Sequence, residues 1–434
     1  MSVALTQSFA ATEARRSVPE QQALWFTGAI FAVSLALQRF GLPFGGKALS
    51  IVGPIGIALV AYGLFKGALS FHKGRLLTFL ALTALILCGM ALHSAEPGGF
   101  GEGASVDSLL QFLLLTSFAV FTFSEPVEEA AFFRVVTFAL MVIACAGVLQ
   151  FIAQFFGLGL FSFTGILPDS LLFEAGYNLE IPLGIGDILK SNGFLLVEPS
   201  VLSQLMALGI IIEASGARRP PFLVAFVAGL LLSFSGTGWI VLGAFVAGSA
   251  IAMGKRGLII ALGVVVALSA TLALAAVLTP DVMDMLTSRL SEISQPGTSG
   301  HMRFVTPFWM LSDVLASHKS AFLLGIGSGG SERLVLPYVY DVNTPIKVMV
   351  DYGFPALICY VALFLLGRKT PIQAAVVAPA IVLFFFAGGY QQFPPMVFIV
   401  LLLTSVARLR VTPQSAASAI NRPAAATRGA PARL

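Results

Sequence analysis

The chain has 434 residues, of which 57% are hydrophobic and only 11% are charged, with a formal excess of four positive charges. Soluble domains carry about 25% charged and about 45–50% apolar residues. This composition, with a mean hydropathy of +0.92, therefore excludes a cytosolic enzyme, a nucleic-acid-binding protein and a secreted domain. It predicts a polytopic membrane protein, because a soluble fold would leave large apolar faces uncovered.

Apolar runs long enough for membrane-spanning helices recur along the chain, since a helix needs about 20 residues to cross the hydrocarbon core. We predict twelve spans, at roughly 23–41, 48–65, 76–92, 106–124, 132–157, 199–214, 220–235, 238–254, 257–279, 345–366, 372–389 and 395–409. The first is not a cleavable signal, because no small-residue cleavage site follows it. The expected fold class is an all-α integral membrane protein of about 12 transmembrane helices.

Basic residues cluster between the predicted spans and indicate their orientation, because loops rich in Lys and Arg stay in the cytoplasm. With twelve spans, all six clusters fall on one side: Arg15 and Arg16; Lys66, Lys73 and Arg75; Arg218 and Arg219; Lys255 and Arg256; Arg368 and Lys369; Arg408 and Arg410. Both termini are therefore predicted to be cytoplasmic.

The predicted organisation has five parts. They are a cytoplasmic segment at 1–22, nine helices at 23–279 with an external loop at about 158–198, a large external loop at 280–344, three helices at 345–410, and a disordered tail at 411–434. The tail is rich in Ala, Pro, Arg and Ser, a composition that cannot form a core. We find no internal repeat. In the large loop, apolar residues at spacings of three and four predict an amphipathic helix from Arg303 to His318, with Phe304, Phe308, Leu311 and Leu315 on one face.

The three cysteines, Cys88, Cys145 and Cys359, all fall in apolar runs. No pair lies in an external loop, so no disulfide is predicted. No Cys/His cluster has metal-ligand spacing, and no cofactor is expected.

Charged side chains are scarce in the predicted spans and collect on the external face. The candidates for a site that binds an anion are Lys190, Arg289, His301, Arg303, His318, Lys319, Arg333 and Lys347, together with the carboxylate Glu198. Arg and Lys are the side chains that recognise phosphate, and the glycine-rich run at 325–330 offers backbone N–H groups for an anion nest. A solvated charge and a flexible turn are the simpler interpretations of such residues.

Glu198 lies where an external loop enters a predicted span. Pro199 suits the first turn of a helix, so Glu198 sits at a helix N-terminus, where the dipole stabilises an anion. It is either a helix-end carboxylate with no further role or a positioned group able to orient or deprotonate a hydroxyl. The residues alone leave both interpretations open.

Four stretches of the chain form an ordered set. Residues 191–200 contain Asn192-Gly193-Phe194 and Glu198-Pro199-Ser200, and residues 232–238 read L-S-F-S-G-T-G. Arg303 and Trp309 precede the run 325–329, and residues 343–353 run from Asn343 through Lys347 to Asp351-Tyr352-Gly353. In order and spacing, over about residues 190–366, this set resembles the bacterial O-antigen ligase and Wzy-type polysaccharide polymerase superfamily. The corresponding patterns of that superfamily are G-F-F-x-E-P-S at the entry to a middle helix, L-S-x-S-R-T-G, R-x(n)-W…hP-x-x-G-x-G-x-G in the large periplasmic loop, and H-N-x-x-L-x-x-x-x-E-x-G.

The resemblance implies a glycosyltransferase with a GT-C-type membrane fold in the bacterial inner membrane. It would join undecaprenyl-diphosphate-linked oligosaccharides at the periplasmic face without a metal, with membrane lipid and a chain-length-regulating copolymerase as further candidate partners and no nucleic acid. Arg303 and Glu198 would be the catalytic residues, the first binding the donor diphosphate and the second orienting or activating the acceptor. The implied substrate-binding residues are Lys190, Arg289, His301, His318, Arg333 and Lys347.

The chain departs from the pattern in ways that bear on its reaction. Val342 stands where the ligases have a His, Gly236 where the second motif has an Arg, and Lys190 where an Arg often occurs. The missing His favours a polymerase of an exopolysaccharide or surface glycan over an O-antigen ligase, with His301 or His318 as its candidate substitute. A ligase of the same superfamily and a lipid-linked oligosaccharide flippase are the alternatives, the latter disfavoured by the lack of repeat symmetry.

Overall fold

The computed structural model describes residues 17–44, 47–95, 105–160, 163, 166–173, 181–183, 187–216, 219–278 and 294–411. This part of the chain is predominantly helical, with three two-stranded sheets. The all-α class predicted from composition is therefore confirmed.

A helix lies within each of the twelve predicted ranges. In chain order they are α2 (Val18–Ala36), α3 (Val52–Phe65), α4 (Lys73–Ala95), α5 (Val106–Thr116), α6 (Glu129–Gln154), α7 (Pro199–Ser215), α8 (Pro220–Leu232), α9 (Thr237–Leu278), α15 (Thr344–Tyr352), α16 (Phe354–Leu365), α17 (Pro371–Phe386) and α18 (Pro394–Leu401). Helix α9 covers two predicted ranges and is broken at Gly254, where φ is 55°. The range 345–366 is divided between α15 and α16 at Gly353.

Most of these helices are shorter than a membrane span. Among the described residues, the segments Lys73–Leu92 and Glu129–Gln154 are long and apolar enough to cross a bilayer, and eight other apolar helices are shorter. Helix α5 passes into the 3₁₀ turn η1 (Ser117–Val120), and α18 into the π-helical turn η5 (Leu402–Val406). The count of twelve spanning helices is therefore not confirmed.

Proline opens many of the helices. It occupies the first or second position of α2, α7, α8, α12, α15, α16, α17 and α18. Its φ is already helical and its missing N–H costs nothing in the first turn. The boundaries of these helices are thus encoded locally.

The predicted amphipathic helix from Arg303 to His318 is wrong as a single helix. The structure has α11 (Ser299–Phe304) and α12 (Thr306–Ser317), which meet at Val305. Pro307 explains the break, because its ring clashes with the preceding turn of a continuous helix. Two further short helices follow, α13 (Ala321–Leu324) and α14 (Gly330–Arg333).

The predicted apolar face of that helix is correct in part. Leu311 and Leu315 pack against a small core that α12 shares with α13 and α15, whereas Phe308 is 53% exposed. Met310 and Val314, which were not predicted, are the buried residues of α12 in that core.

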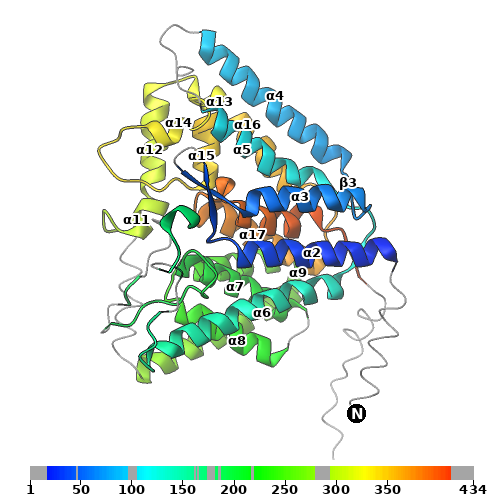
Figure 1. The fold of residues 1–434 in the computed structure, drawn as a ribbon, viewed down its shortest axis with the longest axis vertical. Coiled ribbons are helices and arrows are strands. Elements are labelled where there is room, and N and C mark those ends of the chain that lie inside the picture. The colour runs from blue at the N-terminus through cyan, green and yellow to red at the C-terminus, as the bar shows by residue number, and fades with distance from the viewer. Residues whose placement is uncertain are drawn as a thin grey trace, which may run out of the picture.

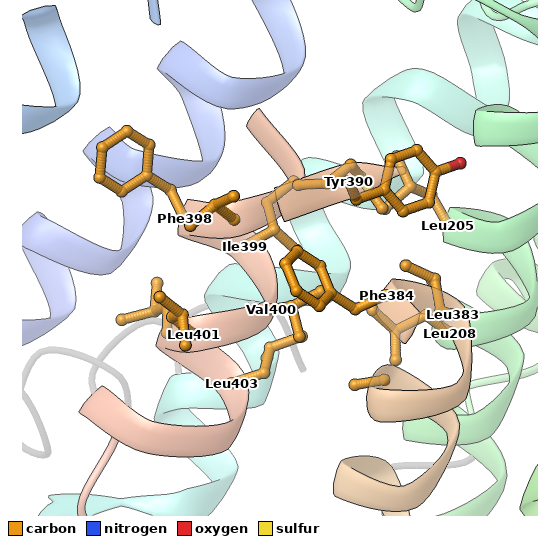
Figure 2. Close-up of a cluster of buried hydrophobic side chains, with 14 of the residues drawn as sticks. Leu205, Leu208, Leu383, Phe384, Tyr390, Phe398, Ile399, Val400, Leu401 and Leu403 are labelled. Atoms are coloured by element: carbon orange, nitrogen blue, oxygen red, sulfur yellow. The ribbon is translucent and has the colours of Figure 1, made fainter. Parts of the chain in front are cut away.

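Helix α7 is the centre of the main core, and every residue from Pro199 to Glu213 is buried. It packs against α6, α8, α9 and α17. Figure 2 shows Leu205 and Leu208 of α7 beside Leu383 and Phe384 of α17, with α18 on the other side of α17. A helix buried all round has little freedom to tilt, so the group at its N-terminus is held rigidly.

The loops gather at two ends of the helix bundle. At one, the Glu198 end, the hairpin of β1 (Gly41–Phe44) and β2 (Lys47–Ser50) contacts the 3₁₀ turn η2 (Asp169–Leu171), on the left in Figure 1. Phe40 bridges to Leu172 there, and the amide of Ser105 donates to the carbonyl of Ser328 over 2.9 Å. Phe40 lies at the predicted external end of the first span, and Leu172, Ser105 and Ser328 lie in three different loops predicted to be external.

The opposite end, the Arg75 end, is on the right in Figure 1. There β3 (Leu69–Phe71) pairs antiparallel with β4 (Phe121–Phe123), and β5 (Val127–Glu128) pairs in parallel with β6 (Leu409–Arg410). These strands belong to segments predicted to share the cytoplasmic side. The two sets of contacts are consistent with an up-and-down bundle in which alternate connections share an end.

Candidate functional site

Glu198 is the N-cap residue of the central helix α7, in an extended conformation before Pro199. Its side chain is 16% exposed. The hydroxyl of Ser200 donates to its Oε2 over 2.5 Å. This bond holds the carboxylate at the helix N-terminus, which is a favourable place for a negative charge.

The loop that leads to Glu198 is held by Gln150 of α6. Its Oε1 accepts from the backbone N–H groups of Asn192 and Phe194 at 3.1 and 3.2 Å, and its Nε2 donates to the side chain of Asn192. Gly193 and Phe194 have positive φ, 73° and 63°. The left-handed region is costly for Phe, so the hydrogen bonds from Gln150 hold a strained turn.

Gln38 and Arg39, which follow α2, support the same loop from the other side. The fully buried Arg39 donates from Nη1 to the carbonyl of Phe194 over 3.0 Å, and Gln38 accepts from the amide of Val197 over 3.3 Å. The backbone before Glu198 is therefore clamped between α2 and α6.

The second resembling stretch, residues 232–238, packs against the start of α7. Thr237 hydrogen-bonds to the hydroxyl of Ser203 at 3.0 Å, and the amide of Gly238 donates to the same hydroxyl. A Cβ on Gly238 would lie 2.5 Å from the carbonyl oxygen of Ser203. Glycine is required for this close approach of the α8–α9 turn to α7.

Arg303 extends from the end of α11 to Glu198. Its Nη2 lies 3.5 Å from Glu198 Oε2, and its Nε donates to Asp341 over 2.8 Å. Burial opposes the charged guanidinium, but Glu198 and Asp341 outweigh burial and raise the pKa of Arg303 above its usual value. The arginine is fully charged at every physiological pH.

Asn343 connects Arg303 to the fourth resembling stretch. It caps α15 by accepting from the amide of Ile346, and its Nδ2 donates to the carbonyl of Arg303 over 3.4 Å. One turn further on, the buried Lys347 donates to Glu332 over 2.6 Å and lies 3.6 Å from Asp351. The N-terminal end of α15 thus carries Lys347 and contacts the backbone of Arg303.

The glycine-rich run does not form an open anion nest, which corrects the prediction. The amides of Ile326 and Gly327 donate to the carbonyls of Val350 and Asp351 over 2.7 and 3.0 Å. Residues 325–330 are buried. The run instead fixes α13 and α14 against α15, because its N–H groups are used in the fold.

These segments surround a cavity of about 440 Å³ at the Glu198 end. Its lining residues are Phe173, Val197, Glu198, Val201, Arg303, Glu332, Tyr340, Asp341, Val342, Lys347 and the segment 387–393. Glu198, Arg303 and Lys347, which the sequence pattern singled out, therefore share one cavity.

The charges in the cavity are mixed rather than purely positive. Arg303 and Lys347 line it together with three carboxylates, those of Glu198, Glu332 and Asp341. The carboxyl side chains of Asp341 and Glu332 are 33% and 52% exposed, whereas that of Glu198 is 16% exposed. The exposed carboxylates therefore lie toward solvent and Glu198 lies deeper.

Tyr390 forms part of the inner wall. Its hydroxyl donates to Gln204 of α7 over 2.9 Å, and in Figure 2 its ring lies between Leu205 and the cluster of α17 and α18. Burial raises the pKa of Tyr390, while Arg303 opposes that rise. The phenol therefore remains a neutral donor in the physiological range.

Four predicted binding residues lie outside the cavity lining. Lys190 is buried beneath the loop and pairs through its backbone with Ile181, and His301 packs edge-to-face on Trp309 with ring centroids 5.1 Å apart. His318 ends α12, and Arg333 donates to the carbonyl of Ser328 over 3.3 Å. Arg289 lies outside the described residues, and Lys319 is exposed beside His318.

Sequence analysis missed Asp341, Glu332 and Tyr390. Cations are the residue types typical of a phosphate site, and carboxylates in the same loop carry no such signal. Tyr390 belongs to the short polar interruption 388–392 between two apolar runs. Its place on the predicted external side was a signal that could have identified it.

Among the described residues, no group of His, Cys, Asp and Glu has the arrangement of a metal site. The cavity does suit a substrate that bears hydroxyl groups. Its carboxylates can accept hydrogen bonds from sugar hydroxyls, and its guanidinium and ammonium groups can donate hydrogen bonds to them.

Comparison with known proteins returns no family: neither protein-family models nor curated proteins match this chain.

Proposed function

We propose that this protein is an integral-membrane glycosyltransferase that polymerises a bacterial surface polysaccharide or exopolysaccharide. Its donor would be a glycan on a polyprenyl diphosphate carrier, handled at the periplasmic face. The observation that carries the proposal is the 3.5 Å approach of Arg303 to Glu198 in a cavity that also contains Lys347.

The proposed reaction assigns a distinct role to each charge. The acceptor hydroxyl attacks the anomeric carbon of the donor sugar, and the bond from that carbon to the diphosphate oxygen breaks. Glu198 orients the hydroxyl and accepts its proton. The electron pair of the broken bond stays on the diphosphate, and Arg303 and Lys347 stabilise that developing negative charge.

The surrounding carboxylates fit this scheme as exchangeable partners. Asp341 pairs with Arg303 and Glu332 with Lys347, and both carboxylates are more exposed than that of Glu198. A diphosphate would displace them toward solvent while Glu198 keeps its bond from Ser200. The cations would then be held in place before the donor arrives, which reduces the cost of ordering them.

The proposal includes a membrane topology. Twelve spans with both termini in the cytoplasm put the cavity on the outer side, where a lipid-linked donor would reach it from the bilayer. Support comes from the hydropathy and from the loop contacts, because segments predicted to share a side hydrogen-bond to one another.

The decisive variants are Arg303→Ala and, as a matched control, Arg333→Ala. Both remove one arginine from the same loop, but Arg333 does not line the cavity. In a deletion strain of the source bacterium, the first should abolish high-molecular-weight polysaccharide and the second should restore it. Removing one cationic side chain that stabilises the negative charge of the transition state should lower the rate about 100-fold or more.

The readout is the polymer length distribution, normalised to membrane expression by immunoblot. Normal polymer from Arg303→Ala would show that the site is assigned wrongly. The deletion strain distinguishes the alternatives: single repeat units accumulating on the outer carrier indicate a polymerase, units retained at the inner face indicate a flippase, and polymer made but not transferred to an acceptor lipid indicates a ligase.

A further inference from the structure

A second group of cations lies at the Arg75 end, far from the cavity described above. It consists of His72 and Arg75 at the start of α4, Lys369 between α16 and α17, and Arg408 after η5. Burial is the largest cause that lowers the pKa of the His72 imidazole. The positive charges of Arg75, Lys369 and Arg408 lower this pKa further.

Arg75 is held rigidly in this group. Its side chain belongs to a residue that is 2% exposed, and its Nη1 donates to the carbonyls of Ala119 and Phe121 over 3.0 and 2.8 Å. Its buried Nε has no hydrogen-bond partner. A buried donor without a partner is costly, which indicates a missing acceptor.

Lys369, like Arg75, donates to a backbone carbonyl and not to a described carboxylate. Its Nζ donates to the carbonyl of Thr404, and burial, followed by the charge of Arg75, lowers its pKa to about 7. A lysine in ion contact with a carboxylate would not lose its proton so readily.

No described carboxylate balances these two cations. Neither Arg75 nor Lys369 has an acidic side chain within ion-pairing distance in the described part of the chain. Glu129 reaches the same loop, but it accepts a hydrogen bond from the hydroxyl of Thr370 instead. Arg75 is buried and Lys369 is half-buried. Charges of one sign in such a place are unfavourable without compensation, so an anion would stabilise the pair.

Space for that anion lies at Gly367. A Cβ placed on this glycine would be 3.7 Å from Arg75 Nη2 and 4.0 Å from Lys369 Nζ, and no third residue contacts that point. An oxyanion there would therefore be flanked by both cationic nitrogens.

The surface beside this space is apolar. Leu77 and Leu80 of α4 are 67% and 53% exposed, and Leu365 of α16, two residues before Gly367, is 56% exposed. Helices α4 and α16 pack against each other. Two cationic nitrogens at Gly367, on helices that carry exposed leucines, suit a ligand that has an anionic head and hydrocarbon chains.

We propose that Arg75 and Lys369 bind the phosphate of an anionic phospholipid whose acyl chains lie along α4 and α16. Basic pockets between helices on the cytoplasmic side are a known physical setting for such headgroups. The inference relies on the proposed membrane placement but not on glycosyl transfer.

The test uses the full-length protein purified in a neutral detergent, with native mass spectrometry to count bound lipids. Phosphatidylglycerol and phosphatidylcholine are added in equal amounts to the wild type, to Lys369→Gln and to Lys73→Gln. Lys73 is the matched control, because it is an exposed lysine at the same end. The wild type and Lys73→Gln should retain phosphatidylglycerol selectively, and Lys369→Gln should bind it about tenfold more weakly.

Arg75→Gln should have the same effect, but Arg75 also supports η1 and β4, so Lys369→Gln is the variant that decides. Each variant is checked for a single cooperative unfolding transition in the lipid-free state. Equal retention of phosphatidylglycerol by Lys369→Gln and the wild type would overturn the proposal.

Inorganic phosphate provides the second arm of the test. At millimolar concentration it should displace the lipid only weakly, because it lacks acyl chains. Complete displacement would show that the site between Arg75 and Lys369 binds a free anion, and this result would also overturn the proposal. Since no polysaccharide is measured, either failure leaves the proposed glycosyl transfer unaffected.

Discussion

Arg303 and Lys347 each lie between two carboxylates, and this pairing separates the observed site from a simple phosphate pocket. The sequence singled out Glu198, Arg303 and Lys347, because their residue types and order fit a charged site at the entry of two helices. It also proposed His301, His318, Arg333 and Lys190, which the structure positions outside the cavity lining. Distances between loop residues depend on how α11 to α14 pack, and no local pattern encodes that packing.

At the residue scale, Lys369 predicts a pH dependence of stability. Its pKa of about 7 in the folded protein lies below the ordinary value of 10.5. Between these values the unfolded chain binds one more proton, so the free energy of unfolding should rise with pH from 7 to 9, by at most about 1.4 kcal/mol per pH unit.

The measurement is thermal unfolding at pH 7 and pH 9, in neutral detergent without anionic lipid, for the wild type and Lys369→Met. The variant should lose most of the rise in stability. An identical rise in both proteins would mean that other groups cause it.

At the scale of elements, the apolar runs predicted where helices lie, and the structure has helix in every predicted range. Their ends and breaks were harder to predict. Proline marks many starts, including that of α16 at Pro355, but the turn at Gly353 that divides the range 345–366 also rests on tertiary contact. A Cβ on Gly353 would lie 2.3 Å from the carbonyl oxygen of Leu323, and one on Gly325 would lie 2.3 Å from that of Asp351.

These contacts predict that Gly353→Ala is strongly destabilising. Its φ of 88° is already unfavourable for alanine, and the added methyl group has no space. We expect a loss of about 2–5 kcal/mol in the free energy of unfolding. Gly67→Ala is the control, because Gly67 also has a positive φ, 73°, but nothing lies within 4 Å of its Cβ position.

The control should cost only the backbone term, about 1–2 kcal/mol. Chemical or thermal unfolding of both variants in detergent measures the difference. If Gly353→Ala were no less stable than Gly67→Ala, the close approach of α13 to α15 would not contribute to stability.

At the scale of the whole molecule, alternate loops meet at opposite ends of the bundle. The positions of the basic residues and the contacts between loops are independent observations, and both divide the loops between the two ends in the same way. The sequence could predict this because the positive-inside rule acts on each loop separately. It could not predict which loops touch, since that depends on the packing of helices distant in the chain.

This arrangement predicts the outcome of a topology experiment. A reporter fused after residue 410 should be active only in the cytoplasm, and one inserted near residue 297 only in the periplasm. Paired alkaline phosphatase and fluorescent protein fusions measure this. Opposite signals at the two positions would contradict the proposed orientation and the periplasmic position of the cavity.

The ion pair between Arg410 and the nearly fully buried Glu20 has a consequence for biosynthesis. Arg410 Nη2 lies 2.8 Å from Glu20, whose other oxygen accepts from the amide of Glu128, and β6 pairs beside it. During translation the first helix is made long before Arg410 leaves the ribosome. A buried carboxylate without its partner is unstable, so the N-terminal helices should stay loosely packed until the last strand closes the bundle.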